Sequence, residues 1–246
     1  MAMYNAEELK AIFSDVIKDN ITMEAWVWLS ADNNIINNTA FNTAFVMIPR
    51  KTGKAIITVT QRQQELLASI RPGFAIDYWT ADRLSRVWLL IKYDSTDKDR
   101  YFRVIENLFS TAEMNEQVAL YSALPVLPYP PLWAKRCMEG IRSNIGTVLE
   151  AIMYNNPYPA ENLEEPAWNQ MVLKAFFTEK QVDKLYGLDY RANKELARIL
   201  IDYAKERYAA GREVNRMLWY LVEKFVTQEQ LNNMKQGHFY GNELLT

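Results

Sequence analysis

Histidine and cysteine are nearly absent from this chain of 246 residues, which contains one of each, His238 and Cys137. A single thiol cannot form an internal disulfide bond. Zinc sites, histidine-based metal sites and nucleophilic sites of the Ser-His-Asp or Cys-His type need more of these side chains than the chain has. The counts therefore argue against all of these sites, and we expect neither a bound metal nor a cofactor.

Long apolar runs are also missing, since no stretch of about 18 apolar residues occurs. The uncharged stretch over residues 118–134 comes nearest, but its prolines would break a spanning helix. The N-terminus has no basic region followed by an apolar run, so we expect no signal peptide. The sequence therefore predicts no membrane span and, by default, a cytoplasmic protein.

The chain also lacks a large excess of charge of either sign. The formal net charge is −2, and acidic and basic residues are mixed throughout the chain. Binding to nucleic acid usually needs a basic face, which this sequence does not show. We therefore expect no nucleic-acid partner.

Apolar residues at helical spacing are abundant, and they recur in segments from Glu7 to Met234. Residues that favour helix N-termini precede several segments, among them Thr22, Thr80 and Asn193. The pattern predicts an all-α protein, either a helical bundle or an irregular helical array. HEAT-like packing of helix pairs is compatible with it, although the sequence shows no strict repeat.

Two segments interrupt this helical pattern, and no linker divides the chain. The β-branched segment 55–60 has no evident partner strand, so we expect an extended connector or the start of a helix. Pro49 is expected to end the apolar segment 45–48. Because no glycine-rich or serine-rich linker occurs, we expect one domain over residues 1–236 and a C-terminal tail over residues 237–246.

Two predicted helices are the most informative. The first runs from Leu132 to about Met153, with apolar residues on one side and glycines among the polar residues. Glycine in a helix often permits close approach by another element. The second covers residues 167–177 and is apolar on most sides, which predicts a central helix. Its core residues are expected to be Trp168, Met171, Val172 and Phe176.

Arg207 projects onto the apolar face of the helix predicted over residues 193–210. An arginine there either extends its charged end to solvent or needs a partner, because an unpaired buried charge is very costly. Our hypothesis is that Arg207 pairs with a carboxylate, and Glu139 and Glu150 are the leading candidates. Lys174 interrupts the apolar 167–177 helix, where a solvated end or an ion pair is a simpler explanation than a catalytic amine.

Solvated faces and core packing explain most polar and aromatic residues in such a chain. A shared polar pocket is the alternative, because the prolines of Asn156-Pro-Tyr-Pro159 would hold a loop rigid at its rim. The candidate residues for this pocket are Glu139, Arg142, Asn144, Glu150, Asn156, Tyr158, Asn169, Lys174, Asp202 and Arg207.

Several ordered segments carry a family pattern. They are Glu139-Gly-Ile-Arg-Ser-Asn144, Glu150-Ala-Ile-Met-Tyr-Asn-Asn-Pro-Tyr-Pro159, Ala167-Trp-Asn-Gln-Met-Val-Leu-Lys-Ala175, Gly187-Leu-Asp-Tyr-Arg-Ala-Asn193 and Asp202-Tyr-Ala-Lys-Glu-Arg-Tyr-Ala-Ala-Gly-Arg212. Weaker similarity extends through residues 49–54 and 116–128. Together these segments resemble the EboA family over roughly residues 45–225, and the most family-like part is 113–225.

The resemblance implies that the protein belongs to a bacterial gene cluster. That cluster is connected with making or exporting secondary metabolites, including movement of precursors across the inner membrane. The implied partners are other proteins of the ebo gene cluster or a small metabolite. It implies no catalytic residue, so none can be assigned on this basis.

Two functions are compatible with the sequence. The first is an accessory or binding protein of a secondary-metabolite biosynthesis or precursor-export pathway, which holds a small molecule or a companion enzyme. The second is a carboxylate-based enzyme of the same pathway, in which Glu139 or Glu150 acts as general acid or base. Arg142 or Arg207 would then bind an anionic substrate. A magnesium or manganese ion held by the two glutamates and Asp202 is a subordinate version of the enzyme.

Overall fold

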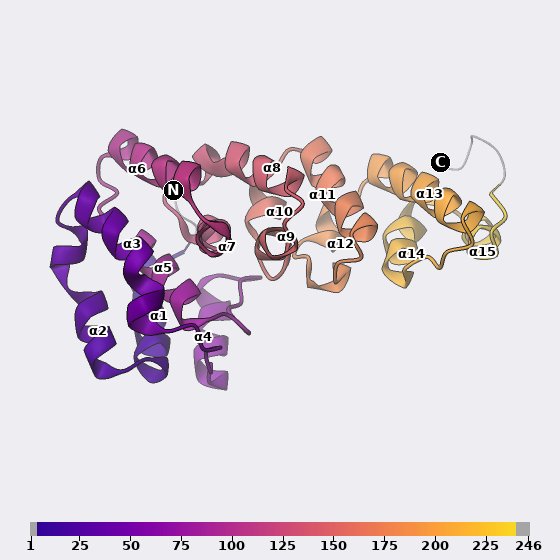
Figure 1. The fold of residues 1–246 in the computed structure, drawn as a ribbon. Coiled ribbons are helices and arrows are strands. Elements are labelled where there is room, and N and C mark those ends of the chain that lie inside the picture. The colour runs from indigo at the N-terminus through magenta and orange to yellow at the C-terminus, as the bar shows by residue number, and fades with distance from the viewer. Residues whose placement is uncertain (1–3, 240–246) are drawn as a thin grey trace. The chain divides into compact units, whose positions relative to one another are not determined.

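The computed structural model describes residues 4–239, and most of these residues lie in helices (Figure 1). Within this range no strand forms, and β-type pairing is limited to an isolated antiparallel bridge between Ile56 and Thr80. The all-α prediction is therefore confirmed. The chain divides into two compact units, residues 1–162 and residues 163–246.

The single domain predicted over residues 1–236 remains a prediction, as does the tail over 237–246. Of that tail, residues 240–246 lie outside the described part of the chain.

The first unit is built from short helices and tight connectors. Its α-helices are α1 (Ala6–Asn20), α2 (Met23–Ser30), α3 (Asn38–Thr52), α4 (Gln61–Ile70), α5 (Ala81–Lys92), α6 (Lys98–Thr111), α7 (Met114–Ala123), α8 (Ala134–Arg142), α9 (Gly146–Met153) and α10 (Tyr158–Asn162). Its 3₁₀ helices are η1 (Asp32–Ile35), η2 (Leu124–Val126) and η3 (Pro130–Trp133).

The second unit is also built from α-helices and short 3₁₀ helices, but it has fewer of them. Its α-helices are α11 (Glu165–Phe177), α12 (Leu188–Arg191), α13 (Lys194–Ala209), α14 (Arg216–Val222) and α15 (Gln228–Lys235). Its 3₁₀ helices are η4 (Val182–Lys184) and η5 (Glu223–Phe225).

Capping side chains fix where several helices begin. Thr22 Oγ1 accepts a hydrogen bond from the Ala25 N–H at 3.2 Å, and Asn193 Oδ1 accepts one from the Leu196 N–H at 2.8 Å. Each cap satisfies a backbone donor that the first helical turn leaves free. The helix starts predicted at these two capping residues are confirmed.

Helix α5 forms the centre of the first unit's core. Leu84, Val87, Leu89 and Leu90 have no exposed surface, and α5 packs against α1, α3 and α7. Burying a leucine or valine side chain stabilises a fold by about 1.5–3 kcal/mol. This packing holds α5 rigidly, and with it the charged residues that α5 carries towards α3 and α7.

Helix α11 forms the core of the second unit, where it packs against α13. Trp168, Met171, Val172 and Phe176 are all buried, which confirms the core predicted from the apolar pattern. Phe177 differs, because 73 % of its surface is exposed. The helix is therefore central but not enclosed on every side.

The single helix predicted from Leu132 to Met153 is wrong. The structure divides this segment into η3, α8 and α9, with a break over residues 143–145. The Ser143 backbone is extended (ψ 150°), and its hydroxyl accepts a hydrogen bond from the Ile145 N–H at 3.1 Å. The apolar spacing continues across the break, so periodicity does not reveal it.

Gly140 permits the close approach that its position predicted. A Cβ atom at this position would lie 2.5 Å from Ile152 Cδ1 and 2.5 Å from Tyr121 Cε1. Atoms that close would clash, so only glycine lets α8 pack at this distance against α7 and α9.

The two interruptions of the helical pattern have different outcomes. Segment 55–60 is an extended connector as expected, and the Ile57 N–H donates to the Trp79 carbonyl at 2.9 Å. The prediction that Pro49 ends a helix is wrong, because α3 continues through Pro49 to Thr52.

Candidate functional site

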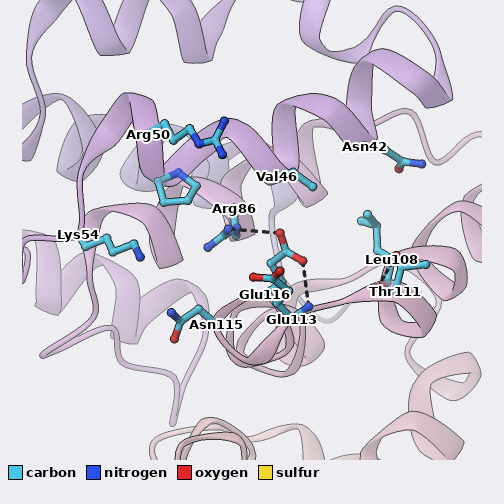
Figure 2. A pocket seen from close by; sticks show the side chains of 11 residues that line it. Asn42, Val46, Arg50, Lys54, Arg86, Leu108, Thr111, Glu113, Asn115 and Glu116 are labelled. Carbon is cyan, nitrogen blue, oxygen red and sulfur yellow. Dashed lines mark hydrogen bonds and ion pairs between the residues drawn. The ribbon is translucent and has the colours of Figure 1, made fainter.

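Two neighbouring pockets open in the first unit. The larger has a volume of about 560 Å³ and lies among α3, α5, α6 and α7 (Figure 2). Polar and charged side chains make up most of its lining. They are Asn42, Arg50, Lys54, Arg86, Thr111, Glu113, Asn115 and Glu116.

The smaller pocket has a volume of about 230 Å³ and lies beside the N-terminal half of α5. Lys54 and Asn115 line both pockets, so these two residues stand at the boundary between them. The other charged and aromatic side chains of the smaller pocket are Tyr78, Asp82, Arg83 and Glu150.

A buried arginine with two acidic partners forms one wall of the larger pocket. Arg86 Nη1 lies 3.0 Å from Asp82 Oδ2, and Arg86 Nη2 lies 3.5 Å from Glu116 Oε1. The Glu116 carboxylate also accepts a hydrogen bond from the Glu113 N–H at 3.1 Å (Figure 2). Burial lowers the pKa of Arg86, whereas Asp82 and Glu116 raise it. The pKa of Arg86 is lowered on balance, because burial is the largest of these effects.

Pro49 contributes to this wall in a way that the sequence did not suggest. A proline has no N–H, so it cannot bond to the carbonyl four residues earlier in a helix. In α3 that carbonyl belongs to Phe45, and it accepts a hydrogen bond from Arg86 Nε at 3.1 Å. The proline within α3 thus leaves free a backbone acceptor that orients the buried arginine.

Arg83 has a different environment beside the smaller pocket. Its Nε donates to the Ser122 hydroxyl at 2.8 Å, and its guanidinium lies 4.1 Å from the centre of the Trp79 ring. Burial lowers the pKa of Arg83 to about 9, and the nearby carboxylates of Asp82 and Glu150 oppose that shift. The site therefore holds a second, poorly solvated positive charge.

Lys54 and Arg50 are exposed at the larger pocket. Among residues 4–239 no ion pair joins either side chain to a carboxylate, although Arg50 Nη1 lies 3.7 Å from Met47 Sδ. In Figure 2 both cations lie on one side of Arg86, and Glu116 lies on the other. The pocket is thus polarised, with uncommitted positive charge at one side.

Six of the residues predicted for a shared pocket lie in the first unit, where they have different surroundings. Glu150 lines the smaller pocket. Glu139 pairs with Arg136 at 2.8 Å, away from both pockets. Arg142 and Asn144 are exposed near the break between α8 and α9.

Asn156 and Tyr158 are buried in structural roles. The Asn156 amide donates to the Ala151 carbonyl at 2.9 Å, and its oxygen accepts from the Tyr158 N–H at 3.0 Å. The Tyr158 hydroxyl donates to the Pro130 carbonyl at 2.5 Å, and burial raises the pKa of this phenol. These contacts fix the loop between α9 and α10.

The remaining four predicted residues lie in the second unit. The buried Asn169 exchanges hydrogen bonds with Asn193 at 2.9 and 3.2 Å, which ties α11 to the N-terminus of α13. Lys174 is half-buried, and desolvation lowers its pKa. Asp202 is exposed and pairs with Arg198 at 3.2 Å.

Arg207 has a different acidic partner from the two that we expected. Its Nη1 lies 3.5 Å from Glu179 Oε1, and its guanidinium donates to the Glu213 carbonyl at 2.8 and 3.0 Å. Glu139 and Glu150 have their own surroundings in the first unit. The arginine is therefore paired, as the hypothesis required, but it joins segments within the second unit.

The residues that define the two pockets were missed by sequence reasoning, with the exception of Glu150. A signal was available in α5, where Asp82 and Arg86 are four residues apart and so within ion-pair reach on a helix. A second signal was the weaker family pattern at residues 49–54 and 116–128, because Lys54 and Glu116 fall within it. The first signal concerns a pair within one helix, whereas the second concerns charges from distant segments, and spacing alone does not bring those together.

A family comparison decides the relationship that the sequence suggested. The family described as metabolite traffic protein EboA matches residues 9–223. The chain belongs to the EboA family. The match includes every segment that lines the two pockets of this EboA-family protein. Neither the curated proteins nor the solved structures provide a match.

Within residues 4–239, no helix is both long enough and apolar enough to cross a membrane. Within the same range, histidine, cysteine and acidic side chains nowhere form a group of three that could hold a metal ion.

Proposed function

We propose that this EboA-family protein is an accessory protein of a metabolite pathway that binds a small polar metabolite in the two pockets of its first unit. The observation that carries this proposal is the pair of adjoining pockets built against the Arg86 ion pairs. The family description, a metabolite traffic protein, agrees with a role in holding or handing on a small molecule.

The energetics of the pocket wall support a role in recognition. Side chains of Arg86 and Asp82 are only 3 % and 5 % exposed, so their charges have lost most of their solvation. Well-packed apolar residues often make a core as stable as a buried ion pair does. The charges therefore suit a site in which polar groups are held rigidly for a ligand better than they suit stability alone.

The enzyme alternative remains a prediction. Of the four residues expected to carry it, Glu150 lines the smaller pocket, whereas Glu139, Arg142 and Arg207 line neither pocket. Binding without catalysis therefore accounts for more of the geometry of the first unit.

Capture of ligands from native cells tests the proposed function. The full-length protein is isolated from the cells that make it, denatured, and the released small molecules are identified by mass spectrometry. The variant Asn115→Trp should fill the boundary between the pockets, because Asn115 is exposed and lines both of them. We expect a small molecule to accompany the unaltered protein and to be lost from this variant.

A matched control separates filling of the pocket from the addition of a large apolar side chain. Asn107 is also exposed but lines neither pocket, so Asn107→Trp should retain the captured molecule. Equal loss in both variants, or equal retention in both, would contradict binding in these pockets.

A further inference from the structure

The acidic groups of the larger pocket are already committed to partners within the protein. Glu116 contacts both Arg86 and the Glu113 N–H, and Asp82, which lines the smaller pocket, also pairs with Arg86. The Glu113 side chain takes part in the capping box at the start of α7. A cationic ligand would have to compete with Arg86 for these carboxylates, which would leave a buried arginine unpaired.

The basic groups at the opposite side of the pocket are not committed. Lys54 and Arg50 form no ion pair among the described residues, and Lys54 lies between the two pockets. Exposed basic side chains are often unpaired, so exposure by itself carries no weight. Here, however, both side chains border one cavity whose acidic groups already have partners (Figure 2).

The smaller pocket adds the positive charge of Arg83, which an anion would stabilise. Arg83 lines this pocket beside Lys54, and its Nε bonds to the neutral hydroxyl of Ser122. The lowered pKa of Arg83 reflects the cost of burying its charge. Asp82 and Glu150 also line the smaller pocket and offset part of this charge, so the side of Lys54 and Arg50 is the more favourable one for an anion.

We propose that the ligand is an oxyanion that also carries hydroxyl groups, such as a phosphorylated or carboxylated polyol. This inference rests on the proposed function and names the chemical class that the same pockets bind. Lys54 and Arg50 donate hydrogen bonds to the phosphate or carboxylate oxygens. The ligand's hydroxyl groups bond to the Asn115 amide and to free lone pairs of the Glu116 carboxylate, which stays paired with Arg86.

The size of the pockets agrees with this class. The larger volume of about 560 Å³ falls within the range of roughly 300–1,000 Å³ found for small-molecule sites. Typical small-molecule sites are mostly apolar, whereas this one is bordered by at least three cationic side chains. Hydroxyl groups match such a lining better than a flat apolar ring does.

Titration calorimetry on the full-length protein with four probes tests the proposal. The probes are glucose 6-phosphate, gluconate, glucose and inorganic phosphate. Glucose 6-phosphate or gluconate should bind more tightly than glucose and inorganic phosphate, because only the first two combine an oxyanion with several hydroxyl groups. Preference for the phosphate or for the carboxylate probe identifies the anionic group. Binding of the preferred probe should weaken with rising salt concentration.

Replacement of Lys54 isolates the contribution of its charge. We expect Lys54→Met to weaken binding of the preferred anionic probe by about tenfold or more, the usual effect of losing one charge-assisted hydrogen bond. The matched control is Lys51→Met. Lys51 is also exposed and lies in the last turn of α3, but its amine lies 5.7 Å from the centre of the Trp28 ring, and the residue lines neither pocket. This control should bind the probe as the unaltered protein does.

The outcomes separate this inference from the proposed function. If glucose binds as tightly as both anionic probes, or if none of the probes binds, the oxyanion class is wrong. The same conclusion holds if Lys54→Met and Lys51→Met bind the probe equally. Capture of a neutral or cationic molecule that Asn115→Trp loses would then leave the pockets as a metabolite site. If no captured molecule is lost from Asn115→Trp and no anionic probe binds, both proposals are wrong.

Discussion

The two units of this protein use charged residues in different ways. In the first unit, Arg86 and Asp82 form an ion pair, and their own side chains are only 3 % and 5 % exposed. In the second unit, Arg198 and Glu195 form an ion pair, and their side chains are 54 % and 50 % exposed. A buried pair must recover a large desolvation cost, whereas an exposed pair loses and gains little. The first unit thus has a buried ion pair within its internal framework, besides exposed pairs such as Lys18–Asp15, whereas the Arg198–Glu195 pair of the second unit lies at the surface.

Arg71 extends this contrast within the first unit. Its side chain is 8 % exposed and forms two hydrogen bonds with the Glu161 carboxylate, at 2.7 and 2.5 Å. Its Nε donates to the Pro125 carbonyl at 2.9 Å, so one buried arginine joins α4, η2 and α10. Arg207 of the second unit also bonds to a carbonyl, but its acidic partner Glu179 is 75 % exposed.

The largest expected effect comes from removal of the buried arginine. Arg86→Ala leaves Asp82 and Glu116 without their cation, and we expect the free energy of unfolding to fall by about 3–5 kcal/mol. Arg198→Ala is the matched change in the second unit and should leave stability within experimental error. Urea titration of the two variants measures the difference. Equal losses would show that the two units do not differ in their use of charge.

Removal of an apolar core residue should affect the second unit just as strongly. Trp168 is 1 % exposed in α11, and Trp168→Ala should lower the free energy of unfolding by about 3–5 kcal/mol. Phe177→Ala, in the same helix but 73 % exposed, should change it by less than about 1 kcal/mol. A loss below about 1 kcal/mol for the tryptophan variant would show that α11 is not the centre of this unit.

The core of each unit could be read from the sequence more readily than the candidate site. Apolar periodicity located α11 and its buried residues because a helix places every third or fourth side chain on one face. It could not locate the break at residues 143–145, since Ile141, Ile145 and Val148 keep the same spacing across it. Local hydrogen bonding by Ser143, not apolar burial, determines that break.

The candidate site depends on contacts between segments that are far apart in the chain. Arg86 meets a carbonyl of α3 and a carboxylate of α7, and neither partner is visible from the spacing within α5. Pro49 gave a misleading signal for the same reason. A proline usually ends a helix because a carbonyl remains unpaired, but here a side chain from another helix satisfies that carbonyl.

Gly140 allows a smaller test of close packing within the first unit. Gly140→Ala would force contacts with Ile152 and Tyr121, and we expect a loss of about 1–3 kcal/mol. The double variant Gly140→Ala with Ile152→Val removes the Cδ1 atom that clashes, so it should recover part of that loss. Thermal and urea unfolding measure both variants. If the double variant is less stable than the single one, the clash with Ile152 Cδ1 is not the cause of the loss.

The smallest expected effect returns to the comparison of the two units, at two residues whose backbones are left-handed. Tyr78 in the first unit has φ 63°, and Glu179 in the second has φ 53°. Tyr78 occupies a turn in which the Trp79 N–H donates to the Ile76 carbonyl, and Glu179 follows the C-terminus of α11. Glycine is the usual residue at such positions, because a Cβ atom makes this backbone less favourable.

Replacement of either residue by glycine should relieve strain, but the two changes should differ in binding. We expect Tyr78→Gly to raise the free energy of unfolding by at most about 1 kcal/mol, and Glu179→Gly to raise it by less, because Glu179 also pairs with Arg207 at 3.5 Å. Tyr78 is 80 % exposed and lines the smaller pocket, whereas Glu179 lines neither pocket. Tyr78→Gly should therefore weaken binding of the captured metabolite while Glu179→Gly leaves it unchanged. If Tyr78→Gly is more stable and yet binds the metabolite more weakly, Tyr78 contacts the ligand. Replacing a residue with a purely structural role would not weaken binding while it stabilises the fold.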